Sequence, residues 1–178
     1  KGGTGKSSIA TLLSGFFAMQ EKKILIIDFD LSFGSIGLLL NKESNKNIYD
    51  LYSDYSNNKF TDISDYVTKY NDNISFLACP KDPRFSNKIE SSIITTLLDK
   101  CKYLYDVILI DTSHSLNPIS LTAMDKSDNT LLMITNDPVD LKNARSMISI
   151  FTDTEKDNYK VLFNASKDTG KDYFSLFD

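Results

Sequence analysis

The sequence contains few of the residues that build cross-linked or zinc-stabilised domains. It has two cysteines, Cys79 and Cys101, and one histidine, His114, in 178 residues. Two isolated cysteines are too few for a disulfide framework or a structural zinc site, so we interpret both as buried, reduced thiols of a cytosolic protein. A lone histidine does not form a nucleophilic triad, and we interpret His114 as an exposed loop residue.

Long hydrophobic runs and an excess of positive charge are also missing. No apolar run approaches the ~20 residues that span a bilayer, and no signal peptide is recognisable. The net charge of −4 argues against a broad electrostatic contact with nucleic acid. With 41% hydrophobic and 25% charged residues the composition is typical of a globular protein, and we expect residues 1–178 to form a single domain.

Short apolar runs alternate with longer amphipathic stretches along the chain. This alternation predicts an α/β fold, in which a doubly wound, mostly parallel sheet carries helices on both faces. We expect residues 107–110, a continuous apolar run, to be buried on both faces of that sheet, and residues 41–73 to form short helices and loops. The predicted strands are residues 22–30, 74–80, 105–113, 129–137 and 159–166, and the predicted helices are residues 7–20, 87–103, 117–127 and 139–151. In the first helix, one apolar face is predicted to contain Ile9, Leu12, Leu13, Phe16 and Phe17.

The chain begins with KGGTGKSS, a glycine-rich run directly before an amphipathic helix. Such a run is typical of a P-loop NTPase, because glycines let successive backbone N–H groups converge on phosphate and the helix N-terminus adds its dipole. Lys6 is expected to contact the β- and γ-phosphates, and the Ser7 hydroxyl to bind Mg²⁺. The residues predicted to bind nucleotide here are Gly2, Gly3, Thr4, Gly5, Lys6, Ser7 and Ser8. The strand that usually precedes such a loop is missing, so we expect a fragment that is truncated at both ends.

Three aspartates end predicted strands and complete the expected magnesium site. Asp111 follows the apolar run Ile108–Ile110 and is expected to hold Mg²⁺, with a simple turn aspartate as the alternative. Asp28 and Asp30 are two residues apart, so their side chains lie on one side of a strand. We expect Asp28 to support the metal and Asp30 to position the attacking water; the alternative is an acidic, solvated strand end.

In combination these motifs resemble those of the MinD/ParA ATPases. KGGTGKSS is similar to their deviant Walker A motif KGGxGK[ST], LIIDFD to their switch I strand and ILID to their Walker B strand. Within that superfamily, the stretches DFDLSFGSIGLLLN, FLACPKDP, YDVILIDTSHSL and TNDPVDLKNARSMISIF look most like the TadZ/CpaE pilus-assembly and localisation ATPases.

The resemblance implies a homodimer that holds ATP at its interface. Lys1 would cross to the partner's nucleotide and act with Lys6 and Asp30 in catalysis. Asn164 corresponds to an asparagine that contacts adenine in relatives, although Ala165 stands where an arginine often follows.

The resemblance also implies the cellular role. Pilus, secretion or polar-localisation proteins would be the partners, and the protein would be recruited to a cell pole or to the inner face of the membrane. The C-terminal stretch KDTGKDYFSLFD lacks the membrane-targeting helix of MinD, so no direct membrane insertion is expected from this segment.

The leading hypothesis is therefore slow Mg-ATP hydrolysis by a nucleotide-dependent dimer that positions a pilus or secretion apparatus. Three alternatives stay open: a ParA-like DNA-segregation ATPase, a MinD-like division-site ATPase, and a scaffold that binds nucleotide without hydrolysing it.

Overall fold

The computed structural model describes residues 3–164, which divide into two compact units. The larger unit is Lys6–Lys126, and the described part of the smaller unit combines residues 3–5 with residues 127–164. We describe each unit by itself. That residues 1–178 form a single ATPase domain stays a prediction.

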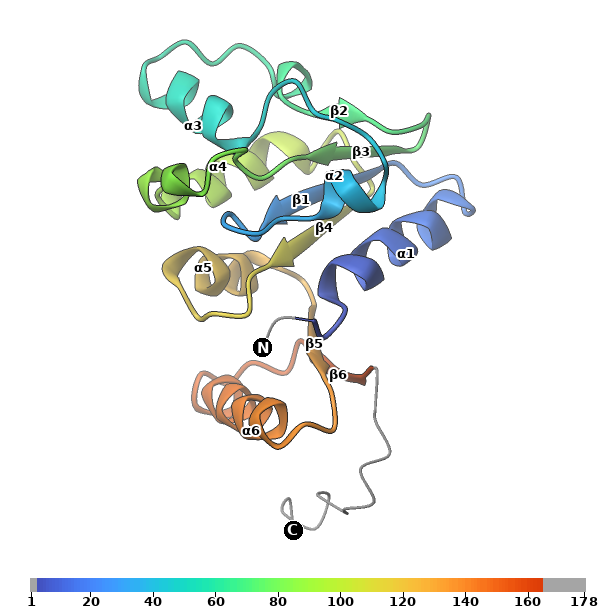
Figure 1. Ribbon diagram of the computed structural model, residues 1–178, viewed down its shortest axis with the longest axis vertical. Helices are drawn as coiled ribbons and strands as arrows, with labels where there is room; N and C mark the ends of the chain where they lie inside the picture. Colours follow the sequence, from blue (N-terminus) through green and yellow to red (C-terminus); the bar gives the residue numbers. More distant parts are fainter. Residues whose placement is uncertain (1–2, 165–178) are drawn as a thin grey trace. The chain divides into compact units, whose positions relative to one another are not determined.

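The larger unit is built around a four-stranded sheet with the strand order β2-β3-β1-β4 (Figure 1). Strands β3, β1 and β4 are parallel, and the two-residue strand β2 pairs antiparallel with β3 at the edge. The strands are β1 (Ile24–Phe29), β2 (Thr68–Lys69), β3 (Ile74–Leu77) and β4 (Val107–Thr112). The helices are α1 (Lys6–Ala18), α2 (Ile36–Leu39), α3 (Ile48–Ser56), α4 (Ser92–Cys101) and α5 (Pro118–Lys126), with short 3-10 helices η1 (Ile63–Asp65) and η2 (Pro83–Lys88).

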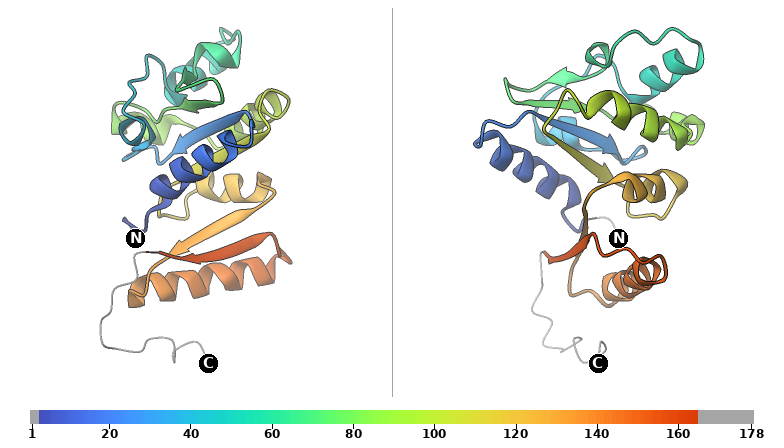
Figure 2. Two further views of the ribbon diagram at one scale, coloured as in Figure 1. Left: turned by 90° about the vertical axis from the view of Figure 1, so that its right-hand side faces the viewer. Right: turned by 180° about the vertical axis from the view of Figure 1, so that it is seen from behind.

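Helices cover both faces of this sheet (Figure 2). Alternate residues of β1 point to opposite sides, so Leu25 and Ile27 pack with the apolar residues of α3, α4 and α5, whereas Ile24 and Ile26 pack with α1 and α2. Every residue of β1 is buried. The predicted α/β fold with a mostly parallel sheet and helices on both faces is thereby confirmed.

Two packing predictions were wrong in detail. Residues 107–110 are only half-buried, because β4 is the outer strand of this sheet and not a central one. In α1 the predicted apolar face is too broad: Ala10, Phe17 and Ala18 pack on the sheet, but Leu12 is 68% and Phe16 57% exposed. A helix rotates by about 100° per residue, so Leu12 and Phe16 lie on the side of α1 opposite to Ala10, Phe17 and Ala18.

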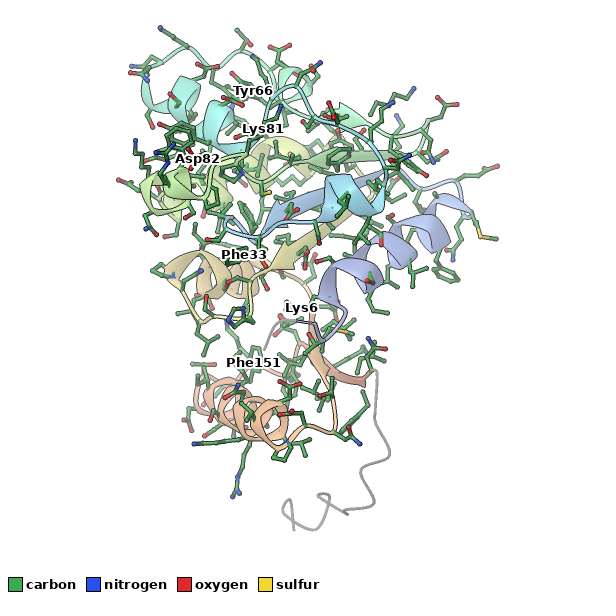
Figure 3. All side chains as sticks on the ribbon, viewed as in Figure 1. Lys6, Phe33, Tyr66, Lys81, Asp82 and Phe151 are labelled. Atoms are coloured by element: carbon green, nitrogen blue, oxygen red, sulfur yellow. The ribbon has the colours of Figure 1, made fainter. Side chains whose placement is uncertain are left out.

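The smaller unit is a parallel β-α-β segment formed by β5 (Thr130–Ile134), α6 (Pro138–Asp153) and β6 (Tyr159–Phe163). Ile134 packs against Leu141 and Ala144 of α6. The ring of Phe151, labelled in Figure 3, stacks on that of Tyr159 with 4.8 Å between the ring centroids. Asp137 caps α6 by accepting a hydrogen bond from the Val139 N–H. Within residues 3–164, no helix is long and apolar enough to cross a membrane.

Candidate functional site

The glycine-rich run forms a tight turn that leads directly into α1. Gly3 and Gly5 have φ angles of +85° and +92°, which only glycine adopts without strain, and α1 begins at Lys6. The first N–H groups of a helix have no partner within the helix, so Lys6 and Ser7 offer free backbone donors at its positive end. The turn therefore has the backbone of an anion-binding loop. Lys1, Gly2 and the C-terminal stretch lie outside the described residues.

Asp111 lies beside the start of this helix, in the larger unit. Its side chain is 3% exposed, and burial raises the pKa of its carboxyl, whereas the Ser7 hydroxyl and the Lys6 ammonium oppose that rise in pKa. Figure 3 labels Lys6 at the beginning of α1. The Asp111 Oδ2 atom is buried and has no hydrogen-bond partner among the described residues. A buried acceptor without a partner, next to a hydroxyl and an ammonium, suits a hydrated cation.

Ser7 and Asp111 together fit magnesium. Mg²⁺ in phosphate sites is usually held by one or two protein oxygens and keeps waters and phosphate oxygens as its other ligands. Residues 3–164 contain no group of three or more His, Cys, Asp or Glu side chains arranged to hold a metal.

Asp28 is paired in register with Asp111 on the neighbouring parallel strand, and it is 1% exposed. Its Oδ2 accepts the Ile36 N–H at 3.1 Å and its Oδ1 accepts the Asp30 N–H at 3.3 Å. Burial, opposed by these hydrogen bonds and reinforced by the charge of Asp111, raises the pKa of Asp28 to about 7. Asp28 therefore ties down the loop between β1 and α2, a role that the sequence did not suggest.

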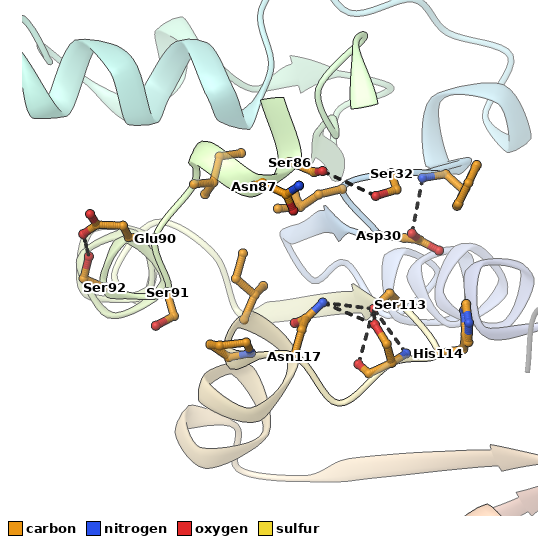
Figure 4. A pocket seen from close by; sticks show the side chains of 16 residues that line it. Asp30, Ser32, Ser86, Asn87, Glu90, Ser91, Ser92, Ser113, His114 and Asn117 are labelled. Atoms are coloured by element: carbon orange, nitrogen blue, oxygen red, sulfur yellow. Dashed lines mark hydrogen bonds between the residues drawn. The ribbon is translucent and has the colours of Figure 1, made fainter. Parts of the chain in front are cut away.

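Asp30 follows the end of β1 and lies in that loop, where its Oδ1 accepts the Phe33 N–H at 3.3 Å. It lines a groove of about 710 Å³ that is bounded by the segments 30–33, 86–92 and 113–119 (Figure 4). The groove is rich in serine; Ser113, Ser115 and Asn117 form a hydrogen-bonded group on one side. His114 is exposed at its edge, as expected for a loop histidine.

Sequence reasoning missed Gly34. A Cβ atom at this position would lie 2.4 Å from the Sγ of Cys79 and 2.5 Å from the Oδ2 of Asp28. Cys79 is half-buried, and burial, with the nearby charge of Asp28 as a smaller cause, raises the pKa of its thiol to about 12. Gly34 is one of two glycines in the stretch after DFD, and only the folded loop shows which atoms approach it.

Asn164 follows β6 in the smaller unit and lies against the glycine-rich turn. Its Nδ2 donates to the Thr4 carbonyl at 2.9 Å, and its backbone N–H donates to the Ile134 carbonyl at 2.8 Å. The sequence associated Asn164 with the nucleotide base. In the structure its amide group is bonded to the turn itself.

Comparison with known proteins gives concordant results. The chain matches the AAA domain family AAA_31 over residues 1–163. It is 26% identical over 154 residues to an uncharacterised ATP-binding protein of Methanocaldococcus jannaschii, covering 83% of this chain and 57% of that protein. It is 25% identical over 150 residues to the septum site-determining protein MinD of Helicobacter pylori, covering 84% and 55%. The chain thus spans about half the length of the curated relatives it matches.

Solved structures show the same fold. A ParA family ATPase from Chlorobium tepidum TLS superposes with a TM-score of 0.80 at 18% identity, over 96% of this chain and 72% of that one. MinD from Pyrococcus horikoshii OT3, solved as a complex with Mg-ADP, gives a TM-score of 0.74 at 22% identity, over 92% and 65%.

Proposed function

The chain belongs to the AAA domain family AAA_31, within the MinD/ParA superfamily of P-loop ATPases, and we propose that it binds Mg-ATP and hydrolyses it slowly. The observation that supports this most is the grouping of Lys6, Ser7 and Asp111 at the N-terminus of α1. There the buried Oδ2 of Asp111 has no hydrogen-bond partner among the described residues, next to a hydroxyl and an ammonium.

Each residue then has a distinct role. Gly2, Gly3, Thr4, Gly5 and Ser8 contribute backbone or hydroxyl contacts to the phosphates, and Lys6 neutralises the charge that develops on the phosphoryl oxygens. Ser7 and Asp111 hold Mg²⁺, with Asp28 in support. When bound, the metal would offset the negative charge of the phosphates.

Asp30 is the residue that we assign to the attacking water. It lies at the end of β1, beyond the carboxyl ends of the parallel strands, where ligands bind in doubly wound sheets. Its carboxylate orients the water and accepts a proton from it as the water oxygen bonds to the γ-phosphorus and the bond from that phosphorus to the β,γ-bridging oxygen breaks, which releases ADP. The hydrogen bond from the Phe33 N–H holds that carboxylate in the loop.

The wider role follows from the sequence motifs. We propose a nucleotide-dependent homodimer in which Lys1 reaches the partner's nucleotide, and a cellular task in positioning a pilus or secretion apparatus. A scaffold that binds ATP without turnover, a MinD-like division-site ATPase and a ParA-like DNA-segregation ATPase are the alternative functions. A net charge of −4 disfavours the ParA-like alternative, and salt-dependent DNA binding is the measurement that separates it from the others.

The first test is ATPase activity of the wild type and three variants. Lys6→Ala should abolish ATP binding, and Asp30→Ala should slow hydrolysis by about 100-fold or more while leaving ATP bound. Asp72→Ala is the matched control, because this carboxylate is exposed, pairs with Lys69 and should change nothing. Hydrolysis by Asp30→Ala at the wild-type rate contradicts the assignment of Asp30, and ATP binding without any wild-type turnover supports the scaffold.

The second test asks whether Lys1 acts across the dimer. Lys1→Ala and Lys6→Ala subunits are each expected to be inactive alone. Mixed in equal amounts, they form heterodimers with one intact site, which should restore about a quarter of the wild-type rate. If the mixture stays inactive although heterodimers form, Lys1 does not act in the partner's site.

A further inference from the structure

We propose that Asn164 is a positioning residue of the phosphate loop, which holds the loop in shape through the Thr4 carbonyl. The proposal rests on the proposed ATP-binding function, since it assigns a role within that site. Asn164 and the loop residues 3–5 belong to the same compact unit.

The hydrogen bond joins two positions that are 160 residues apart in the sequence. The Nδ2 of Asn164 donates to the Thr4 carbonyl at 2.9 Å, and Thr4 is 4% exposed. Only the NH₂ end of the amide can donate to a carbonyl, so chemistry fixes which way the side chain is turned. A buried carbonyl needs such a donor, because leaving it unpaired costs more than the bond itself contributes.

The Asn164 side chain packs closely against Gly5. A Cβ atom at Gly5 would lie 2.3 Å from the Nδ2 of Asn164, closer than two such atoms can approach. At Gly3, by contrast, an added Cβ would meet nothing within 4 Å, so only its φ angle requires glycine. Gly5 is thus required for two reasons, its φ angle of +92° and the space that Asn164 occupies.

Asn164 is itself held by the sheet of the smaller unit. Strands β5 and β6 pair in parallel from Thr130 and Tyr159 to Ile134 and Phe163, and the Asn164 N–H extends this pattern by donating to the Ile134 carbonyl. A side chain anchored in this way can fix the loop, because its backbone has little freedom. In the sequence the loop residues directly precede Lys6 and Ser7, whose backbone N–H groups we assign to the phosphates.

Base selection and loop positioning make different predictions for ligands that lack adenine. The experiment compares wild type, Asn164→Leu and Asn158→Leu; leucine has nearly the shape of asparagine but cannot donate. Asn158 is the matched control, because its Nδ2 also donates to a backbone carbonyl, that of Ser127, at 2.9 Å in the same unit. Dissociation constants are measured for ATP, GTP and inorganic tripolyphosphate, and amide hydrogen exchange is followed in the peptide that covers residues 1–10.

Asn164→Leu should weaken the binding of all three ligands by the same factor, roughly five-fold, and should speed exchange in the loop peptide without ligand. Asn158→Leu should do neither. The proposal is wrong if only ATP binding falls, which would indicate base selection, or if loop exchange is unchanged or rises equally in both variants. If wild-type protein binds none of the three ligands, the proposed ATP-binding function is wrong, whereas the exchange comparison still decides the role of Asn164.

Discussion

Replacing Asp28 by asparagine should stabilise the protein above pH 7. The Asp28 carboxyl is 1% exposed, and its pKa is raised from the ordinary value of 3.8 to about 7, with burial as the largest cause. The folded protein therefore holds this proton at a pH where the unfolded chain has already released it. Stability is lost as the pH rises from 3.8 to 7, because the charged carboxylate must then be accommodated in the interior.

The magnitude follows from this difference in pKa. At 1.36 kcal/mol per pKa unit, the ionised carboxylate costs about 4 kcal/mol of folding free energy above pH 7. Asparagine keeps an oxygen that can accept the Ile36 N–H, but it loses the weaker bond from the Asp30 N–H, for about 1 kcal/mol. We therefore expect Asp28→Asn to raise the free energy of unfolding by about 3 kcal/mol at pH 8 and not to raise it near pH 4.

Urea unfolding at pH 4 to 8, without Mg²⁺ or nucleotide, measures this effect. The wild type should lose stability across that range, and the Asp28→Asn variant should lose much less, with the raised pKa of Asp111 accounting for part of the remaining slope. Asp72→Asn is the control, because the pKa of this exposed carboxyl is lowered by its hydrogen bond to Lys69, so the change should not stabilise. If Asp28→Asn is no more stable than the wild type at pH 8, burial does not penalise the Asp28 carboxylate and the reasoning fails.

Two further substitutions test the loop and the packing around it. Gly34→Ala should cost about 1–3 kcal/mol in urea unfolding and lower ATPase activity, because the added Cβ would lie 2.4 Å from the Cys79 Sγ. Gly15→Ala, where nothing lies within 4 Å of an added Cβ, should instead stabilise α1 by about 0.5–1 kcal/mol, so equal losses in both variants would contradict the packing argument. Asn47→Ala should cost about 1 kcal/mol, because the Asn47 side chain accepts the Tyr49 N–H at 2.8 Å and the Asp50 carboxylate accepts the Asn47 N–H in return. An unchanged urea midpoint for Asn47→Ala would show that this cap does not stabilise α3.

The strands that carry the site could be predicted because each contains a continuous apolar run followed by an aspartate. Continuous apolar runs before Asp28 and Asp111 indicated parallel strands, and both residues lie on paired strands in register. Strand β2 has only two residues in a polar stretch, which is too short for a recognisable alternation. The helix predicted to begin at residue 87 begins at Ser92, after the 3-10 helix η2, which starts at Pro83.

The contacts that shape the site could not be predicted, because they join distant or irregular segments. Spacing placed Asp28 and Asp30 on one side of a strand, but β1 ends at Phe29 and Asp30 belongs to a loop. The proximity of Gly34 to Asp28 depends on how that loop folds back. The bond from Asn164 to Thr4 spans nearly the whole chain, and no local pattern marks it.

Asp28 and Asn164 illustrate how chemistry selects the residue type when a side chain holds a backbone loop. The Asp28 carboxylate accepts hydrogen bonds from the N–H groups of Ile36 and Asp30. An ionised carboxylate can only accept, so it suits a loop that presents backbone donors. Asn164 faces a carbonyl and must donate, which an ionised carboxylate cannot do. The exchange of amide and carboxylate is therefore not symmetric: asparagine at position 28 keeps an oxygen for the Ile36 N–H, whereas aspartate at position 164 leaves the buried Thr4 carbonyl without a donor. We expect Asp28→Asn to preserve the loop between β1 and α2. We expect Asn164→Asp to loosen the glycine-rich turn.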